Sequence, residues 1–298
     1  MQLKPWFQLV RIPTVFSAMC NAYAGYWIGE GKAGFSSLIF GMLASGLFLM
    51  AGMILNDIAD FHEDLRDRPQ RPLPSGAISR SAAWVSALTM MILGLGLQGL
   101  ANPVCTAVGV LLIGAIFAYN FILKNTVIGP LSMGLCRLLN LLTGIALGAN
   151  GLSDLLYLPM STYVVLGLLG FYVACVTFLA REETRGNSSG RIKVFFAGLA
   201  LWILVWVFFA LQQPMMNFLL LSSILLLLLR RLYFPLKKLW QEPHLPSSTQ
   251  RSVGTLLGCL PLADVMAMFL SGVAWPFALA GWIFTLPGPF LTKRFYST

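Results

Sequence analysis

Long apolar segments recur along the whole of this 298-residue sequence. Crossing the hydrocarbon core of a bilayer, about 30 Å thick, takes about 20 apolar residues in a helix. Backbone groups cannot bond to water there, so only helices or closed barrels can span, and the period-two alternation of strands is absent. The sequence therefore predicts an all-α, polytopic membrane helix bundle. Its apolar segments are 9–30, 36–56, 82–101, 104–122, 127–149, 157–180, 193–212, 214–232, 252–271 and 273–291.

The composition supports this assignment, because 57% of the residues are apolar and only 10% are charged. A soluble domain carries about 25% charged residues. The net charge of +9 could suggest a nucleic-acid partner, but no nucleic-acid-binding motif is present. We expect one membrane-embedded domain over residues 1–298, with lipid as its surroundings. We also expect no cleaved signal peptide, because the first span is too long for one and has no typical cleavage site.

The distribution of Lys and Arg predicts the orientation of the bundle. The connections after the odd-numbered segments contain only Lys32, whereas those after the even-numbered segments are basic. Cytoplasmic loops carry the excess of positive charge in membrane proteins. We therefore expect the N-terminus and all the basic loops to lie in the cytoplasm. The basic residues of these loops are Arg66, Arg68, Arg71, Arg80, Lys124, Arg181, Arg185, Arg191, Lys193, Arg230, Arg231, Lys237, Lys238 and Arg251.

The acidic residues are few and concentrated. Five of the 11 lie between Asp57 and Asp67, directly after the second apolar segment. If the helix continues through this stretch, Asn56, Asp60 and Asp64 fall at i, i+4 and i+8 on one face, with Asp57 beside them. Oxygen ligands suit a hard cation such as Mg²⁺, which typically uses one or two carboxylates together with phosphate oxygens.

A solvated helix end neutralised by nearby arginines is the simpler alternative for this stretch. The one-face spacing and the scarcity of acids elsewhere favour a site instead. Three prolines and a glycine in residues 68–79 end the helix and form a turn, which should return Arg71 to the acidic face. A guanidinium there could orient the carboxylates or clamp a phosphate through two hydrogen bonds.

Two motifs resemble the UbiA superfamily of intramembrane prenyltransferases. The first is N-D-x-x-D-x-x-x-D followed by R-P-x-R-P-L-x-x-G, complete over residues 56–76; the second begins at Tyr119-Asn120 and includes Lys124, Arg137 and Asn140. The family's plan of nine helices around a central cavity, with two Asp-rich cytoplasmic loops, fits essentially the whole chain. Our count of ten segments exceeds it by one, and Trp275-Pro276 could turn the last segment into a hairpin that does not fully cross.

The resemblance implies Mg²⁺-dependent transfer of a prenyl group from an isoprenoid diphosphate to an acceptor that the sequence does not identify. Asp60, Asp64, Lys124 and Arg137 would be the catalytic residues. The metal would be bound by Asn56, Asp57, Asp60 and Asp64, with Glu182 and Glu183 from the second motif. The diphosphate would be bound by Arg71, Tyr119, Lys124, Arg137 and Asn140.

The second acidic motif departs from the family pattern. Active relatives carry D-x-x-x-D there, whereas this chain has Ala180 and Thr184 at the two aligned positions, and only Glu182 and Glu183 are acidic. The longer Glu side chains could still bind Mg²⁺. Alternatively, this half of the site binds one metal ion fewer, or the protein acts on a different substrate.

Two charged residues inside predicted spans leave further alternatives open. Arg137 and Asp264 are costly in a bilayer unless they pair or face a cavity. Arg137 could contact the diphosphate or an acidic residue, and Asp264 could be protonated, pair with Arg137 or bind the acceptor. The competing functions are a protein of the same fold that binds or cyclises an isoprenoid without transferring it, and a membrane transporter.

Overall fold

The computed structural model describes residues 3–288, 290 and 291, and every regular element in this part of the chain is helical. The predicted all-α fold is confirmed. The α-helices are α1 (Leu3–Leu9), α2 (Ile12–Ile28), α3 (Phe35–Ala59), α4 (Phe61–Asp67), α5 (Arg80–Ala101), α6 (Pro103–Ala118), α7 (Gly129–Ala146), α8 (Met160–Ala180), α9 (Ser189–Ala210), α10 (Met215–Gln241), α11 (Pro246–Gly258), α12 (Leu260–Leu270) and α13 (Trp275–Ala280). A π-helix, η1 (Tyr119–Leu123), and two 3-10 helices, η2 (Leu152–Leu156) and η3 (Gly281–Thr285), complete the set.

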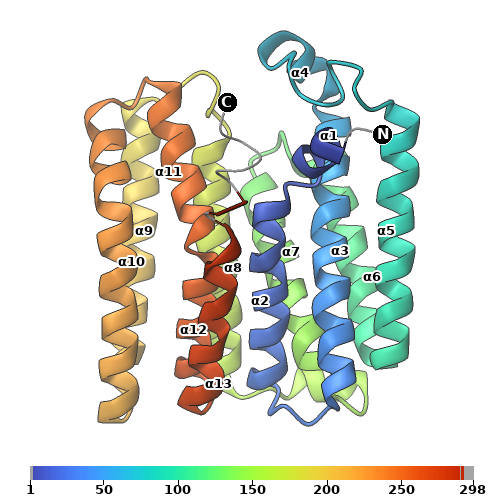
Figure 1. Ribbon diagram of the computed structural model, residues 1–298. Coiled ribbons are helices and arrows are strands. Elements are labelled where there is room, and N and C mark those ends of the chain that lie inside the picture. The colour runs from blue at the N-terminus through green and yellow to red at the C-terminus, as the bar shows by residue number, and fades with distance from the viewer. Residues whose placement is uncertain (1–2, 289, 292–298) are drawn as a thin grey trace.

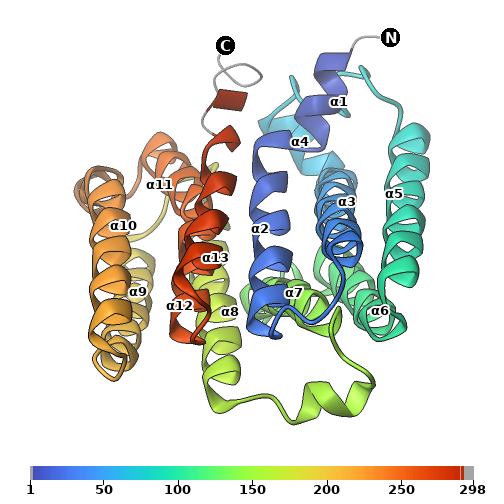
Figure 2. The same ribbon diagram turned by 60° about the horizontal axis from the view of Figure 1, so that its bottom comes forward.

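The long helices stand side by side and alternate in direction (Figure 1). Helices α2 and α7 pack on each other at the centre (Figure 2). On one side they contact α12 and α8, and on the other α3 and α6. The connections 60–79, 119–128, 181–188 and 242–245 all lie at the end that also carries α1 (Figure 1). The two acidic segments and the loop with Lys124, in which the sequence predicts the site, are therefore at one end of the bundle.

Seven helices of the described residues are long and apolar enough to cross a membrane. They are α3, α5, α6 together with η1, α8, α9, α10, and α11 together with α12. Helices α2 and α7 are shorter but lie within the same bundle. The last predicted segment, 273–291, forms no single long helix, because α13 has only six residues and a 3-10 helix follows it. The chain turns at residues 271–274, and Trp275 and Pro276 are the first two residues of α13 rather than the turn itself.

Glycines allow the central helices to approach closely. A Cβ atom on Gly25 of α2 would lie 2.1 Å from the carbonyl oxygen of Leu141 on α7, and one on Gly144 would lie 2.2 Å from that of Ala22. Gly134 of α7 makes a similar approach to the backbone of Gly170 on α8, at 2.4 Å. Small residues at such crossings permit the backbone packing that replaces the hydrophobic effect between helices in lipid. Helix α7 is thus held on both sides by backbone contact.

This packing predicts that Gly144→Ala destabilises the bundle. The added methyl has no space, and overpacking of this kind costs about 1–3 kcal/mol. Thermal unfolding of the purified protein in detergent measures the loss. The matched control is Gly114→Ala on α6, where nothing lies within 4 Å of the new Cβ and helix propensity should improve. Equal midpoints for Gly144→Ala and the unaltered protein would show that the helices do not approach as described.

Candidate functional site

The acidic stretch after α3 contains a break in the helix. Helix α3 ends at Ala59 and α4 begins at Phe61, with Asp60 between them at φ −85° and ψ 1°. The prediction of an uninterrupted helix through this stretch is therefore wrong. The acidic side chains around the break fall into two groups: Asn56 and Asp60 contact Lys124, whereas Asp57 and Asp64 contact Arg71.

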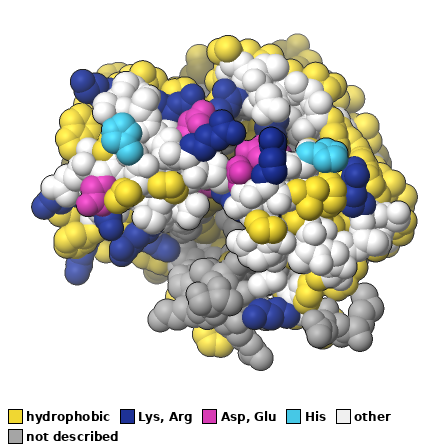
Figure 3. All heavy atoms as spheres, turned by 90° about the horizontal axis from the view of Figure 1, so that it is seen from above, with side chains coloured by type: hydrophobic (Ala, Val, Ile, Leu, Met, Phe, Trp, Pro, Cys, Tyr) yellow, Lys and Arg dark blue, Asp and Glu magenta, His cyan; other side chains and the backbone are white. Residues whose placement is uncertain are grey.

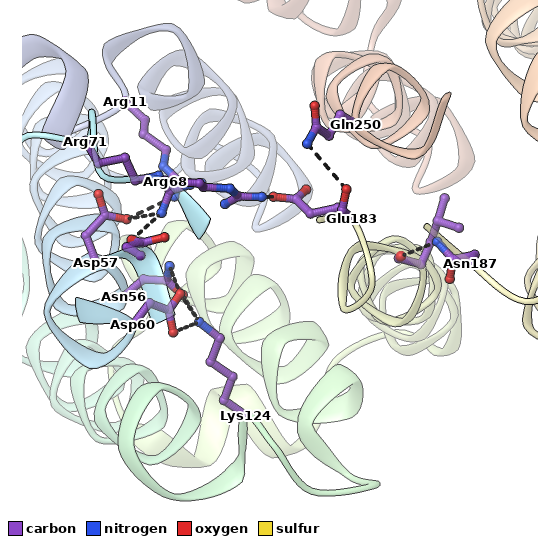
Figure 4. Close-up of polar contacts among 12 residues, drawn as sticks. Arg11, Asn56, Asp57, Asp60, Arg68, Arg71, Lys124, Glu183, Asn187 and Gln250 are labelled. Atoms are coloured by element: carbon purple, nitrogen blue, oxygen red, sulfur yellow. Dashed lines mark hydrogen bonds and ion pairs between the residues drawn. The ribbon is translucent and has the colours of Figure 1, made fainter. Parts of the chain in front are cut away.

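Asn56 and Asp60 share one cation. The Lys124 ammonium, which follows η1, donates to Oδ1 of Asn56 at 2.9 Å and to the Asp60 carboxylate at 2.5 Å (Figure 4). The amide of Asn56 also donates to Asp60 at 3.1 Å. The carboxamide is thereby oriented with its oxygen toward the lysine. A positive charge already lies where a carbonyl oxygen and a carboxylate converge.

Asp57 and Asp64 are matched by arginines. Arg71 Nη1 lies 2.7 Å from Oδ2 of Asp64 and 3.5 Å from Oδ1 of Asp57, so the predicted return of Arg71 to the acidic face is confirmed. Burial raises the pKa of Asp64, although Arg71 opposes this. Burial lowers the pKa of Arg71, but the carboxylates of Asp57 and Asp64 outweigh it and raise that pKa. Asp64 is buried and Arg71 is largely buried, and the two opposite charges stabilise each other.

Arg11 also belongs to this cluster and was not predicted. Its Nη2 lies 3.0 Å from Oδ1 of Asp57. The residue lies between α1 and α2 in a left-handed conformation (φ 48°), which turns the chain at the edge of the bundle. Its only signal in the sequence is a single Arg at the start of an apolar segment before Pro13. Such a residue would ordinarily be interpreted as an interfacial anchor.

The second acidic segment pairs with arginines rather than with the first cluster. Glu183 accepts a hydrogen bond from Arg68 Nη2 at 2.5 Å, which joins the loop after α4 to the loop after α8 (Figure 4). We call the region between these two loops the mouth of the site. Glu182 lies 3.6 Å from Arg191. Gln250 of α11 donates to the backbone carbonyl of Glu183 at 3.3 Å. These glutamates therefore connect loops in this structure.

Arg181 ties the same loop to the segment that carries Lys124. Its guanidinium donates to the backbone carbonyls of Lys124, at 2.9 Å, and of Thr126. Burial lowers the pKa of Arg181. Tyr119 lies on η1, and its carbonyl accepts from the Lys124 backbone amide at 2.8 Å. The position of Lys124 is thus held from both sides. Figure 3 shows the acidic side chains near the middle of this end, with Lys and Arg around them.

Arg137 and Asn140 are engaged deeper in the bundle. Arg137 Nη2 lies 2.5 Å from Oδ2 of Asp264, and both side chains are buried. Of the partners that the sequence left open for these two residues, the structure shows this pairing. Asn21 donates to the other Asp264 oxygen at 2.9 Å and accepts from Asn140 at 2.9 Å. Ser45 of α3 then donates to Asn140 at 2.6 Å.

This network does not hydrogen-bond to the acidic cluster among the described residues. It connects α2, α3, α7 and α12, which come from both apolar clusters of the bundle. Arg137 Nη1 and Nη2 and the Asn140 amide contact Asp264, Asn21 and the backbone carbonyls of Ser17 and Ala18, whereas Arg137 Nε is buried without a hydrogen-bond partner. These contacts connect the central helices to one another.

The oxygen groups of the first cluster can be tested for their fit to a metal. No group of three or more His, Cys, Asp or Glu side chains placed to hold a metal ion occurs in the described part of the chain. Asn56 and Asp60, however, already enclose the Lys124 ammonium. One carboxylate and one carbonyl oxygen, completed by water and phosphate oxygens, match the coordination of Mg²⁺. The donor set therefore fits Mg²⁺ bound together with a phosphorylated ligand.

The fold and the site together define a polytopic helical membrane protein with a cation-matched acidic cluster at one end of the bundle. The family model of the UbiA prenyltransferase family matches residues 18–184, which is more than half of the chain. The protein belongs to the UbiA prenyltransferase family.

Relatives and solved structures agree with this membership. The digeranylgeranylglyceryl phosphate synthase of Sulfurisphaera tokodaii is 31% identical over 146 residues, covering 48% of this chain and 52% of its own. The enzyme of the same name from Saccharolobus solfataricus is 27% identical over 197 residues, with 65% and 68% covered. A 4-hydroxybenzoate octaprenyltransferase from Vibrio atlanticus is 28% identical over 138 residues, with 44% and 49% covered. The chain thus spans about half to two thirds of these relatives.

The structural neighbours show the same fold. A UbiA homolog from Aeropyrum pernix K1 in its apo form superposes with a TM-score of 0.67 at 18% identity, covering 91% of this chain and 96% of that one. A UbiA homolog from Archaeoglobus fulgidus bound to DMAPP and Mg²⁺ gives a TM-score of 0.66 at 14% identity, with 93% and 98% covered. The architecture is therefore that of the family over nearly the whole chain.

The buried network predicts a large stability loss for Asp264→Ala. Removing the carboxylate leaves the Arg137 charge buried without a partner, which costs about 3–5 kcal/mol. The double variant Arg137→Leu/Asp264→Ala should regain part of that loss, because neither charge remains. Thermal or denaturant unfolding in detergent measures both. The single variant Arg137→Leu completes the comparison. If the double variant loses as much free energy of unfolding as Asp264→Ala and Arg137→Leu together, the pair does not interact as the geometry indicates.

Proposed function

We propose that this protein transfers a prenyl group from an isoprenoid diphosphate to an acceptor within the membrane, with Mg²⁺ as its cofactor. The observation that carries the proposal is the convergence of Asn56, Asp60 and Lys124 at the membrane end of the bundle. Arg71 and Arg11 add two more cations beside the same carboxylates. Charged residues at the edge of an apolar bundle are costly unless they are paired, and they commonly mark a functional site.

The relatives support this chemistry. The enzymes that match are named for the synthesis of a digeranylgeranylglyceryl phosphate and for octaprenyl transfer to 4-hydroxybenzoate. The Archaeoglobus fulgidus homolog has been solved with DMAPP and Mg²⁺ and with GPP and Mg²⁺. A prenyl group or isoprenoid diphosphate is common to these descriptions, whereas the products and acceptors that they name differ. We therefore propose the donor by class and regard isoprenoid glycerol phosphates as the first acceptor class to test.

In this proposal Asn56 and Asp60 hold Mg²⁺, with Asp57 and Asp64 close enough to join them. The metal would neutralise the charge that develops on the departing diphosphate. Lys124 and Arg71 are held close to the same oxygens, so a small side-chain movement transfers their hydrogen bonds from carboxylates to phosphate oxygens. Each carboxylate would lose its lysine or arginine partner and gain Mg²⁺, so its negative charge would stay matched as the substrate binds.

The apolar bundle would protect the reactive intermediate. Ionisation of an allylic carbon–oxygen bond leaves a carbocation, which water would quench. The diphosphate groups would stay at the charged end while the prenyl chain extends among the apolar helices. Tyr119 is the first residue of η1, between the charged end and the apolar helix α6, and its carbonyl accepts from the backbone amide of Lys124. It remains a proposed contact of the diphosphate end of the donor.

The second acidic segment has a different proposed role from the first. Glu182 and Glu183 would have to release Arg191 and Arg68 before they could bind a metal. We place the metal at the first cluster and propose that Glu183 orients Arg68 across the mouth. Arg137 and Asn140 act as positioning residues for α2 and α7. The basic loops support a cytoplasmic location for this end of the bundle.

The deciding experiment compares two acidic variants. Purified protein in lipid is incubated with Mg²⁺, prenyl diphosphates from C10 to C20 and longer, and candidate acceptors, and diphosphate release is measured. Asp60→Ala should reduce release by on the order of 10²–10³-fold, the scale of losing one electrostatic stabiliser. Glu63→Ala removes an exposed carboxylate from the neighbouring helix α4 and should retain activity.

Three outcomes would contradict the proposal. Absence of Mg²⁺-dependent release with every donor would exclude prenyl transfer and leave the isoprenoid-binding alternative. Release that Asp60→Ala does not alter would show that the metal is bound elsewhere. Equal losses in Asp60→Ala and Glu63→Ala would indicate a general effect of charge rather than a site.

A further inference from the structure

A basic groove lies at the same end of the bundle, between the last turns of α10 and the start of α11. It has a volume of ≈ 440 Å³. This lies within the range of about 300–1,000 Å³ typical of small-ligand sites. The residues that line it are Phe234, Pro235, Lys237, Lys238, Gln241, Glu242 and Arg251. None of them belongs to the acidic cluster described above.

The groove carries an excess of unmatched positive charge. Lys237 and Lys238 lie on α10, and Arg251 faces them from α11. Glu242 is the single acidic residue of the lining and lies 3.7 Å from Lys238. Among the residues that the structure describes, Lys237 and Arg251 have no carboxylate within 4.0 Å. Three cations on two helices thus line one concave surface that carries a single carboxylate.

Exposed aromatic rings place this groove at the boundary between lipid and water. Phe234, Tyr233 and Trp240 are 72%, 57% and 55% exposed, and Lys237 lies 5.9 Å over the Tyr233 ring. They follow the apolar part of α10, which is long enough to cross the membrane. Aromatic and basic residues together mark the interface of a membrane protein. Figure 3 shows Lys and Arg gathered beside hydrophobic side chains on the side of α9 to α11.

We propose that this groove binds the headgroup of an anionic phospholipid. The phosphodiester would accept hydrogen bonds from Lys237 and Arg251, the two lining cations without a carboxylate partner, and the acyl chains would lie along the exposed aromatic side of α10. The alternative is that these side chains simply extend to water from the membrane interface. That alternative would not require the cations of two helices to line one groove. A free phosphate would use the cations but not the aromatic rings. The combination therefore fits a lipid, and basic pockets between membrane helices have this specificity.

Native mass spectrometry of the full chain tests the proposal. The protein is released from detergent containing equal amounts of phosphatidylglycerol and phosphatidylcholine. We expect preferential retention of phosphatidylglycerol and at least a tenfold loss in Lys237→Gln/Lys238→Gln/Arg251→Gln, since each cation near an anionic lipid contributes a factor of about five. The control Lys4→Gln/Arg66→Gln/Lys193→Gln removes three exposed cations elsewhere at this end and should retain the lipid.

The outcomes separate the possible occupants. Equal retention of the two lipids, or equal losses in the two triple variants, would overturn the proposal. Displacement of phosphatidylglycerol by inorganic phosphate or glycerol phosphate at comparable concentrations would show an anion site without lipid specificity and would also overturn it. Unfolding midpoints of both variants establish that each is folded. Lipid retention is measured without turnover, so it does not depend on the proposed prenyl transfer.

Discussion

Charge balance at the end of an apolar bundle is the constraint on which the rest of the site depends. Asp57, Asp60 and Asp64 lie close together at the end of a membrane-spanning helix, where each unmatched carboxylate would be costly. The chain matches them with cations from three other segments, at Arg11, Arg71 and Lys124. Because these cations come from segments far apart in the sequence, the site depends on the packing of α2, α3, α6 and α7 against one another.

The packing of those helices has two sources. Glycines let α7 approach α2 and α8 at backbone distance, and the buried network around Arg137 and Asp264 connects α2, α3, α7 and α12. The glycines set how close the helices lie, and the buried network favours the arrangement in which Arg137 and Asp264 meet, because leaving either charge buried without a partner is costly. The loop contact between Arg68 and Glu183 then holds the two sides of the mouth at a defined separation.

Much of this architecture could be predicted because it follows from local physical rules. Apolar length indicates spans, and the distribution of basic residues places the functional loops at one end. The proline-rich turn predicts the position of Arg71. The break at Asp60, the contribution of Arg11 and the pairing of Glu183 could not be obtained in the same way. Each of these features involves a contact between segments that are distant in the sequence. Such contacts are decided by tertiary packing rather than by neighbouring residues.

Arg137 illustrates the limit of such reasoning. Its position inside a span shows that it needs a partner, but the sequence offers both a phosphorylated substrate and Asp264. The structure shows the pairing with Asp264, and on that basis we propose that Arg137 supports the helices rather than the diphosphate. The degraded second motif is similar, since Glu183 keeps an acidic charge but uses it to hold Arg68.

The central claim is that Asn56 and Asp60 hold a divalent cation together with a prenyl diphosphate. Its most direct test is a crystal structure with Mn²⁺ in place of Mg²⁺ and a non-hydrolysable prenyl thiodiphosphate, with the metal located by anomalous scattering. The account predicts a peak about 2.0–2.2 Å from oxygens of both side chains, with Lys124 moved onto the diphosphate. A peak at Glu182 and Glu183 alone, or no peak while the ligand is bound, would contradict it.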